Sequence, residues 1–174
     1  MQPILDHLKS RYLNTNLHRT WLDENNYLAT FPLWNLSNQL VGYQKYNPKG
    51  DKKTFNNPTL GKYYTYRTKP ENAVWGLESW NVSNPLFVTE GIFDAARLTW
   101  NNMSAIAVMS NDPSDTIKNW LWTIRKFRPV VAICDNDSAG RKLAKFGTYS
   151  EVVEGHDLGD ASNEYVDKLI KKYT

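Results

Sequence analysis

The sequence has 174 residues, of which 41% are hydrophobic and 22% are charged, as in an ordinary soluble globular protein. This length accommodates one α/β domain with a modest appendage. No apolar run approaches the ~20 residues that cross a bilayer, and the first residues lack the basic-then-apolar form of a signal peptide. The single cysteine, Cys134, excludes an internal disulfide and a cysteine-rich zinc site. We therefore expect no membrane partner and a reducing, cytoplasmic location.

The chain begins with helical patterns. Apolar residues at helical spacing predict a helix over residues 2–13. A second short helix is expected from about Asn16 to Glu24, where it would bury Leu17, Trp21 and Leu22.

The pattern then changes to that of strands. Residues 27–34 and 39–46 resemble two strands, joined by the turn-forming residues 35–38. The segment 47–58 is polar, basic and rich in turn-forming residues, which predicts an exposed loop.

Cations and aromatic residues are interleaved between Val41 and Pro70, a span with Asp51 as its only carboxylate. Such a mixture can bind phosphates and stack bases. Lysines along an edge strand can instead prevent aggregation. The two interpretations are evenly balanced for this segment alone, and a metal site beside it would favour nucleotide or nucleic acid. The net charge of +3 permits an anionic partner without requiring one.

After Trp80 the chain alternates regularly between strand and helix patterns. Asp112 and Pro113 suit the cap and first turn of the second of these helices. Four βα units imply a parallel sheet, and a strand order of 2-1-3-4 would make the first and third strands neighbours. A boundary at residues 81–84 would divide the chain into domains 1–84 and 85–174. The expected strands are 86–89, 104–109, 130–134 and 149–153, and the expected helices are 91–101, 113–126, 138–147 and 161–172.

Two of these strands end in carboxylates. Glu90 follows the first strand, and Asp135 and Asp137 follow the third. Ligands bind at the carboxyl edge of open α/β sheets, so we expect these three side chains to converge there. Three such charges would repel strongly without a cation. Their hard oxygens suit Mg²⁺, which takes further ligands from waters and substrate phosphates.

Other residues could complete or weaken this prediction. Asp160 follows the fourth strand and could join the acidic cluster, while Arg141 could balance the charge of a bound phosphate. Each acid also has a structural alternative. Asp137 could cap the helix that begins near Ser138, and Glu90 could favour a helix N-terminus through the dipole. Asp160 could cap the last helix, and its two roles are about evenly balanced.

The segments 88–94, VTEGIFD, and 134–141, CDNDSAGR, resemble the glutamate and DxD motifs of a Toprim domain. Motif, order and spacing agree over about half of the chain. Toprim domains occur in bacterial-type primases, topoisomerases, recombination mediators and certain nucleases. Residues 159–164 also resemble the segment that follows the last core strand of phage primase–helicases, and the upstream β region resembles theirs more weakly.

The resemblance implies an α/β fold, with a Toprim-like Rossmannoid parallel sheet flanked by helices and preceded by a small α+β N-terminal subdomain. By position, Asp135, Asp137 and Asp160 resemble ligands of Mg²⁺ or Mn²⁺. Glu90 resembles the acid/base residue of nucleotidyl transfer and is counted among the metal ligands, with Asp94 as a supporting catalytic carboxylate. The cations assigned to nucleotide or nucleic acid are Lys45, Lys49, Lys52, Lys53, Arg67 and Arg141.

The main hypothesis is a compact, phage-like DNA primase core that joins NTPs on a single-stranded DNA template, in a bacterium or a phage-infected host. The sequence has no cysteine-rich zinc module, helicase domain or P-loop. A replicative helicase or a zinc-module protein would supply those functions in trans, or they would be dispensable. The alternatives are a small Toprim nuclease that cleaves DNA or RNA and a non-catalytic, nucleic-acid-binding replication accessory protein.

Overall fold

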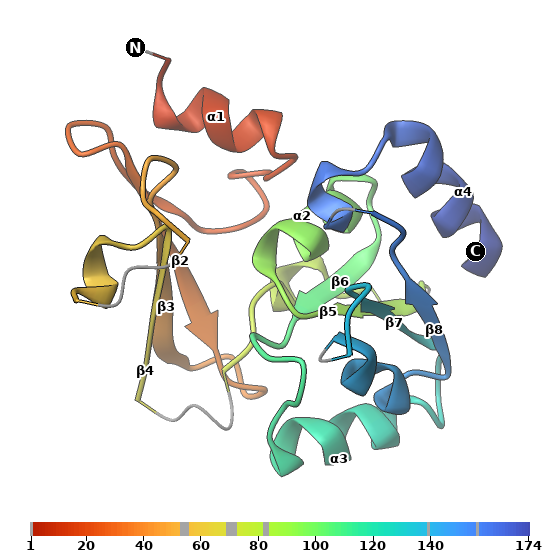
Figure 1. Ribbon diagram of the computed structural model, residues 1–174. Helices are drawn as coiled ribbons and strands as arrows, with labels where there is room; N and C mark the ends of the chain where they lie inside the picture. The colour runs from red at the N-terminus through yellow and green to blue at the C-terminus, as the bar shows by residue number, and fades with distance from the viewer. Residues whose placement is uncertain (1, 53–55, 69–72, 82–83, 139, 156) are drawn as a thin grey trace.

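The computed structural model describes residues 2–52, 56–68, 73–81, 84–138, 140–155 and 157–174. It contains an antiparallel and a parallel sheet, each of four strands, with helices on both faces of the parallel one (Figure 1). Among the described helices, none combines the length and the apolar character that crossing a bilayer requires.

The antiparallel sheet has the order β1-β2-β3-β4. The two expected strands are present as β2 (Leu28–Trp34) and β3 (Leu40–Tyr46), paired antiparallel. Along β2, Ala29, Phe31 and Leu33 are fully buried, so the period-two pattern turns one face towards the core. The outer strands are β1 (Trp21–Asp23) and β4 (Tyr63–Arg67), and α1 (Ile4–Ser10) precedes the sheet.

One expectation for this region is wrong. Residues 16–24 form a turn and β1 instead of a helix, and Leu17, Trp21 and Leu22 are 37%, 47% and 38% exposed. The side chain of Asn14 accepts hydrogen bonds from the backbone N–H groups of Asn16 and Leu17, which favours a turn over a helix start. In addition, β4 occupies part of the basic aromatic span. β4 is an edge strand of the antiparallel sheet, and both interpretations of the span, protection against aggregation and binding of nucleic acid, remain predictions.

The parallel sheet has the order β6-β5-β7-β8, which is the 2-1-3-4 arrangement considered from the sequence. Every residue of the central strands β5 (Leu86–Thr89) and β7 (Val130–Cys134) is buried, as expected for short apolar runs covered on both faces. The outer strands are β6 (Ser104–Ala107) and β8 (Tyr149–Val152).

Helices cover the two faces of this sheet unequally. On one face, α2 (Ile92–Trp100) and α4 (Asn163–Tyr173) share a core with α1 and the antiparallel sheet. On the other face, α3 (Asp115–Ile124) and the 3₁₀ helix η4 (Gly140–Phe146) enclose a separate core. Short 3₁₀ helices at η1 (Pro58–Leu60), η3 (Leu77–Ser79) and η5 (Leu158–Asp160) complete the described elements.

Several helix ends differ from the sequence-based expectation. Ser114, not Asp112 or Pro113, caps α3, and its side chain accepts a hydrogen bond from the Ile117 N–H. The helix expected over residues 138–147 is the shorter 3₁₀ helix η4. Ser162 caps α4, so the capping alternative for Asp160 is wrong. The boundary expected at residues 81–84 remains a prediction, because residues 82 and 83 lie outside the described part of the chain.

Candidate active site

The strand β5 brings Glu90 to the carboxyl edge of the parallel sheet. The Glu90 carbonyl accepts a hydrogen bond of 3.0 Å from the Met109 N–H, which ties the backbone to the segment after β6. The hydroxyl of Thr89 donates to the Gly91 carbonyl at 2.8 Å and holds the turn into α2. The half-buried Glu90 side chain is therefore placed by the strand end and not by a flexible loop.

The neighbouring strand β7 brings Asp135 to the same edge. The Asp135 carbonyl accepts a hydrogen bond of 2.8 Å from the Asp137 N–H, and the Asp137 carboxylate accepts one from the Gly140 N–H. A Cβ at Gly140 would lie 2.7 Å from the Asp135 carbonyl oxygen, so only glycine fits this close approach. Asp137 thus fulfils the capping role that was its structural alternative, at the start of η4.

The segment after β8 adds further acids. Asp94, in the first turn of α2, accepts a hydrogen bond of 2.9 Å from the Gly159 N–H of η5. Asp157 precedes η5, and Asp160 at its end forms a 2.9 Å ion pair with Arg11. The guanidinium of Arg11 also lies 4.8 Å from the centre of the Phe93 ring. The residues after α1 therefore hold η5 beside α2.

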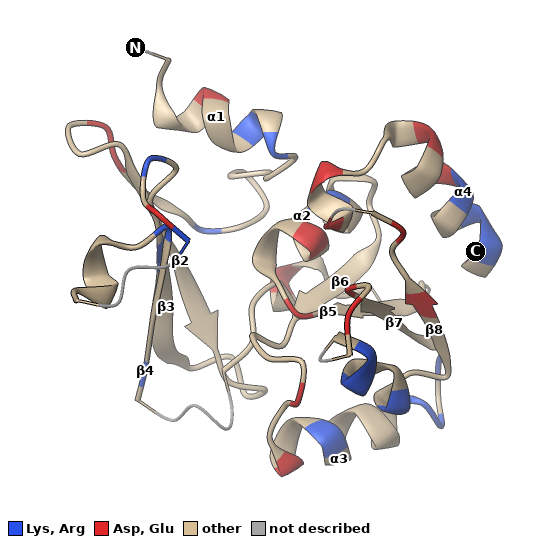
Figure 2. Cartoon of the chain, viewed as in Figure 1, with Lys and Arg blue, Asp and Glu red and all other residues tan. Residues whose placement is uncertain are grey.

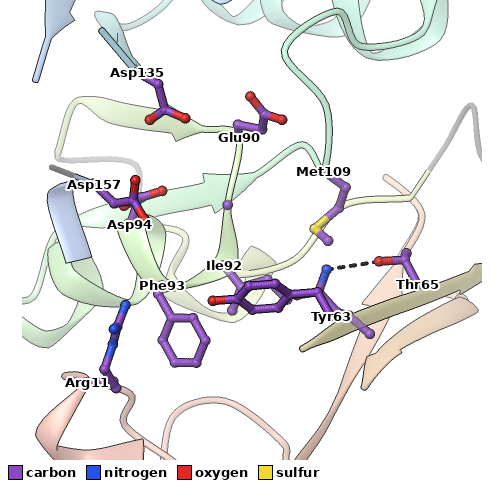
Figure 3. A pocket seen from close by; sticks show the side chains of 12 residues that line it. Arg11, Tyr63, Thr65, Glu90, Ile92, Phe93, Asp94, Met109, Asp135 and Asp157 are labelled. Carbon is purple, nitrogen blue, oxygen red and sulfur yellow. Dashed lines mark hydrogen bonds between the residues drawn. The ribbon is translucent and has the colours of Figure 1, made fainter. Parts of the chain in front are cut away.

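These side chains surround a pocket of about 290 Å³ between the two sheets. Glu90, Asp94, Asp135 and Asp157 line its acidic side (Figure 3). The antiparallel sheet supplies the facing wall, where Gln44 donates a 2.9 Å hydrogen bond to the Thr65 hydroxyl beside Tyr63. Arg11 is the cationic member of the described lining.

Burial and mutual repulsion raise the pKa values of these carboxyl groups. The pKa of Glu90 is raised by burial and by the charges of Asp135 and Asp137. That of Asp135 is raised by burial, Asp157 and Asp137. Burial is also the main cause that raises the pKa of Asp94 to about 7, against the lowering effect of the Gly159 hydrogen bond. The pocket therefore has a strongly negative potential that a bound cation would relieve.

The donor set fits a hard divalent cation. No described lysine, arginine or histidine forms an ion pair with Glu90, Asp135, Asp137 or Asp157. Within the described residues, no group of three or more His, Cys, Asp or Glu side chains is positioned to hold one ion. Mg²⁺ is usually bound through one or two carboxylates, with waters and substrate phosphates completing its shell. The acids therefore suit an ion that arrives with a phosphate ligand.

Several solved structures that share this architecture are primases. A search of family models and a search of curated proteins find no match to the sequence. The structure of a DnaG primase catalytic domain bound to ssDNA is 17% identical with a TM-score of 0.61, over 83% of this chain and 52% of that one. The primase fragment of the bacteriophage T7 primase-helicase protein is 15% identical with a TM-score of 0.59, over 84% and 62%. The Aquifex aeolicus primase, with zinc-binding and RNA polymerase domains, is 22% identical with a TM-score of 0.57, over 84% and 40%.

The chain has the fold of a primase catalytic core. It spans 40% to 62% of the lengths of these three structures. The α/β architecture expected from the sequence, with a parallel sheet preceded by a small α+β region, is confirmed by this primase fold.

The cations predicted to bind nucleic acid lie outside the pocket of this primase fold. Of the five in the described residues, Lys45 lies 5.7 Å from the Tyr64 ring and Lys49 lies 4.8 Å from the Tyr27 ring. Lys52 is exposed, Arg67 is half-buried in β4, and Arg141 donates a hydrogen bond to Asn136. None of these five lines the pocket. Lys53 lies outside the described residues, and the assignment of all six remains a prediction.

Two charged residues of the described pocket lining, Asp157 and Arg11, were not predicted from the sequence. Asp157 lines the pocket, whereas Asp160, the expected ligand, is not among the described lining residues and is paired with Arg11. The acid pair 157 and 160 after the fourth strand was visible in the sequence, but spacing could not say which member faces the site. Arg11 follows a helix 79 residues before Glu90 and gave no sequence signal.

Proposed function

We propose that this chain is a compact primase catalytic core, which joins ribonucleotides from NTPs into an RNA primer on single-stranded DNA. The observation that carries the proposal is the gathering of Glu90, Asp94, Asp135 and Asp157 in one pocket at the carboxyl edge of the parallel sheet. The primase fold supports the assignment of that pocket to nucleotidyl transfer. The antiparallel sheet supplies the facing wall of that pocket, through Gln44, Tyr63 and Thr65.

In the proposed reaction, the primer 3′-oxygen attacks the α-phosphorus of the bound NTP, and pyrophosphate leaves as the new phosphodiester bond forms. Glu90, half-buried with a raised pKa, accepts the proton of the attacking hydroxyl. Asp94 supports the site by holding η5 through the Gly159 N–H. Arg11 donates hydrogen bonds to an NTP phosphate, for which its planar guanidinium is well suited.

Asp135 and Glu90 would hold Mg²⁺ or Mn²⁺, with Asp137 and Asp157 beside them. Such an ion, when bound, offsets the charge of the phosphates and of the leaving pyrophosphate. Asp160 remains a predicted ligand whose present partner is Arg11.

The proposed template contacts are the cations beside β3 and β4, with Arg141 on the opposite side of the acidic edge. We further propose that a zinc module or a helicase acts with this core in the cytosol. The Aquifex primase carries a zinc-binding domain, and the phage fragment belongs to a primase-helicase protein.

A paired assay tests the proposal. Labelled NTPs are offered on single-stranded templates, and labelled DNA or RNA is offered for cleavage, each with Mg²⁺, with Mn²⁺ and with a chelator. We expect metal-dependent incorporation that Glu90→Gln, Asp135→Asn and Asp137→Asn abolish while the fold is retained. Asp167→Asn, which removes an exposed carboxylate from α4, is the matched control and should keep activity.

The other outcomes select the alternatives. Metal-dependent cleavage without incorporation would replace the proposal with a nuclease. Neither activity, together with nucleic-acid binding that Asp135→Asn does not change, would indicate an accessory protein.

A further inference from the structure

Two adjoining cavities lie at the amino edge of the parallel sheet, the edge opposite to the candidate active site. Their volumes are about 410 and 440 Å³, and Pro129 and Tyr173 line both. Pro129 directly precedes β7, and Tyr149, which lines one cavity, is the first residue of β8. We call this surface the amino-edge groove and define it by Phe127, Arg128, Pro129, Tyr149, Lys172 and Tyr173.

The groove presents aromatic rings to solvent. Phe127 is 81% exposed and Tyr149 is 51% exposed. The Tyr149 ring packs at 5.4 Å from the Tyr173 ring, which fixes its orientation. Phe127 and Tyr149 line adjoining cavities, and each exposed ring offers a face on which a base can stack without requiring a defined sequence.

The groove also contains a buried cation without a polar partner. Arg128 is 9% exposed, and its guanidinium lies 4.7 Å from the centre of the Trp80 ring. Within the described residues, none of its three guanidinium nitrogens has a hydrogen-bond partner. The three nitrogens are themselves covered, so a phosphate in the groove would interact with this desolvated charge through space and not by direct contact.

The surroundings are basic as well. Figure 2 shows lysine and arginine in the segment after α3 and in the last turn of α4. Lys172 pairs with Glu151, which neutralises both charges. Exposed cations also adjoin the groove-lining residues in the sequence: Arg125 and Lys126 precede Phe127, and Lys171 precedes Lys172. The positive charge and the exposed aromatic surface together fit a polyanion that carries aromatic bases.

We propose that the amino-edge groove binds single-stranded polynucleotide, with bases stacked on Phe127 and Tyr149 and phosphates near Arg128 and Lys126. An acidic peptide would satisfy the cations but would leave the two exposed rings without a matching partner. The inference rests on the proposed function, which brings template and product strands to this chain. Strands of four or five residues separate the two edges by about 13–17 Å, so a strand leaving the pocket can reach the groove around β8, the outer strand.

Binding can be measured without any chemistry. The probe is a fluorescent oligothymidylate of about 16 nucleotides, the upper end of common single-strand site sizes. Its anisotropy is followed with a chelator present and NTPs absent. Phe127→Ala and Tyr149→Ala should each raise the Kd at least fivefold, which corresponds to about 1 kcal/mol, the lower end for one stacked base. Trp21→Ala removes an aromatic that is 47% exposed on β1 and should leave the Kd unchanged.

The charge contribution has its own readout. Lys126→Gln should reduce the slope of log K against log salt concentration by about 0.7, the value for one phosphate contact to a single strand. Arg128→Gln should weaken binding in the same direction. Because Arg128 is buried, the binding result for Arg128→Gln counts only if the unfolding midpoint of this variant equals that of the parent protein. Lys126 is exposed, so Lys126→Gln tests the charge contribution independently.

Cross-linking locates the strand. Oligonucleotides with photoreactive thymidine or uridine should cross-link to peptides that contain Phe127 or Tyr149, and the two arms compare DNA with RNA. Asp135→Asn should leave these cross-links intact, so they persist even if the proposed catalysis fails. If the protein synthesises primers but neither Phe127→Ala nor Tyr149→Ala changes the Kd for the oligonucleotide, the proposal that the groove binds polynucleotide is wrong and the proposed function stands. If polyglutamate displaces the fluorescent probe as effectively as unlabelled oligothymidylate does, the groove binds an acidic protein partner, and the polynucleotide proposal is wrong.

Discussion

The guanidinium of Arg11 lies 2.9 Å from the carboxylate of Asp160 and so joins the segment after α1 to η5, at the far end of the chain. The Arg11 side chain is 20% exposed, and it also covers the Phe93 ring. One cation therefore holds together the wall of the pocket that faces Asp94.

We predict that Arg11→Ala lowers the free energy of unfolding by about 1–2 kcal/mol, between the values for exposed and buried ion pairs. Urea unfolding measures this change. A double-mutant cycle with Asp160→Asn should show that the two effects are not additive. Lys9→Ala is the control, since its contact with Asp6 is exposed and 4.0 Å long. Additive effects would show that Arg11 stabilises through Phe93 and not through Asp160.

The raised pKa of Asp94 predicts that stability without metal falls as the pH rises. Its pKa is about 7 in the folded protein and 3.8 when unperturbed. The folded state therefore binds more protons between these values, and the free energy of unfolding decreases with pH across that window. Asp94→Asn should flatten this decrease while keeping an oxygen that accepts the Gly159 hydrogen bond. The free energy of unfolding of the parent protein and of Asp94→Asn is measured in urea from pH 4 to 7.5 with chelator. If the two proteins lose stability in parallel as the pH rises, Asp94 is not the cause and the prediction is wrong.

Metal should stabilise the protein through Asp135. At tenfold excess over its Kd, Mg²⁺ or Mn²⁺ should add about 1.4 kcal/mol to the free energy of unfolding. Asp135→Asn should remove this gain. In chelator at pH 7 Asp135→Asn should be more stable than the parent protein. The Asp135 carboxylate repels Glu90, as the raised pKa of Glu90 indicates, and the variant removes this repulsion. Thermal unfolding with and without metal tests both signs. A variant less stable in chelator would argue against repulsion in the pocket.

Gly140→Ala should disturb the site more than the fold. Its Cβ would lie 2.7–2.9 Å from Asp135 atoms, so Asp135 must shift. We expect at least a tenfold weaker metal affinity by calorimetry. Gly155→Ala is the matched control. Gly155 has φ +93° and nothing within 4 Å of an added Cβ, so alanine should cost about 1 kcal/mol of stability and leave metal affinity unchanged.

The parallel sheet could be predicted from the sequence because its strands are short, fully apolar and separated by helix patterns. Residues 86–89 and 130–134 occur as expected, and the observed order places Glu90 and Asp135 at neighbouring strand ends. Period and length were sufficient to predict these two strands, whereas their order in the sheet was only assumed.

The N-terminal region was harder to predict because its pattern is weaker. Leu17, Trp21 and Leu22 fit a helix by spacing, yet pairing of Leu22 with Ala29 decides for a strand. The identity of the fourth acid also depends on tertiary contacts, since Asp160 is paired with an arginine from the other end of the chain. Pairing between distant segments does not follow from local patterns.

The ring of Phe93, on α2, lies 4.8 Å from that of Tyr46 and 5.9 Å from that of Phe31, so a helix that covers the parallel sheet meets the antiparallel sheet in one aromatic cluster. The spacing between the acidic edge and the wall with Tyr63 and Thr65 is consequently set by how these rings interlock. Replacing Phe93 with a smaller apolar residue would narrow the opening of the pocket without removing any of its carboxylates. Under the proposed function, the size of NTP that the pocket accepts would therefore depend on a buried ring that is not a metal ligand.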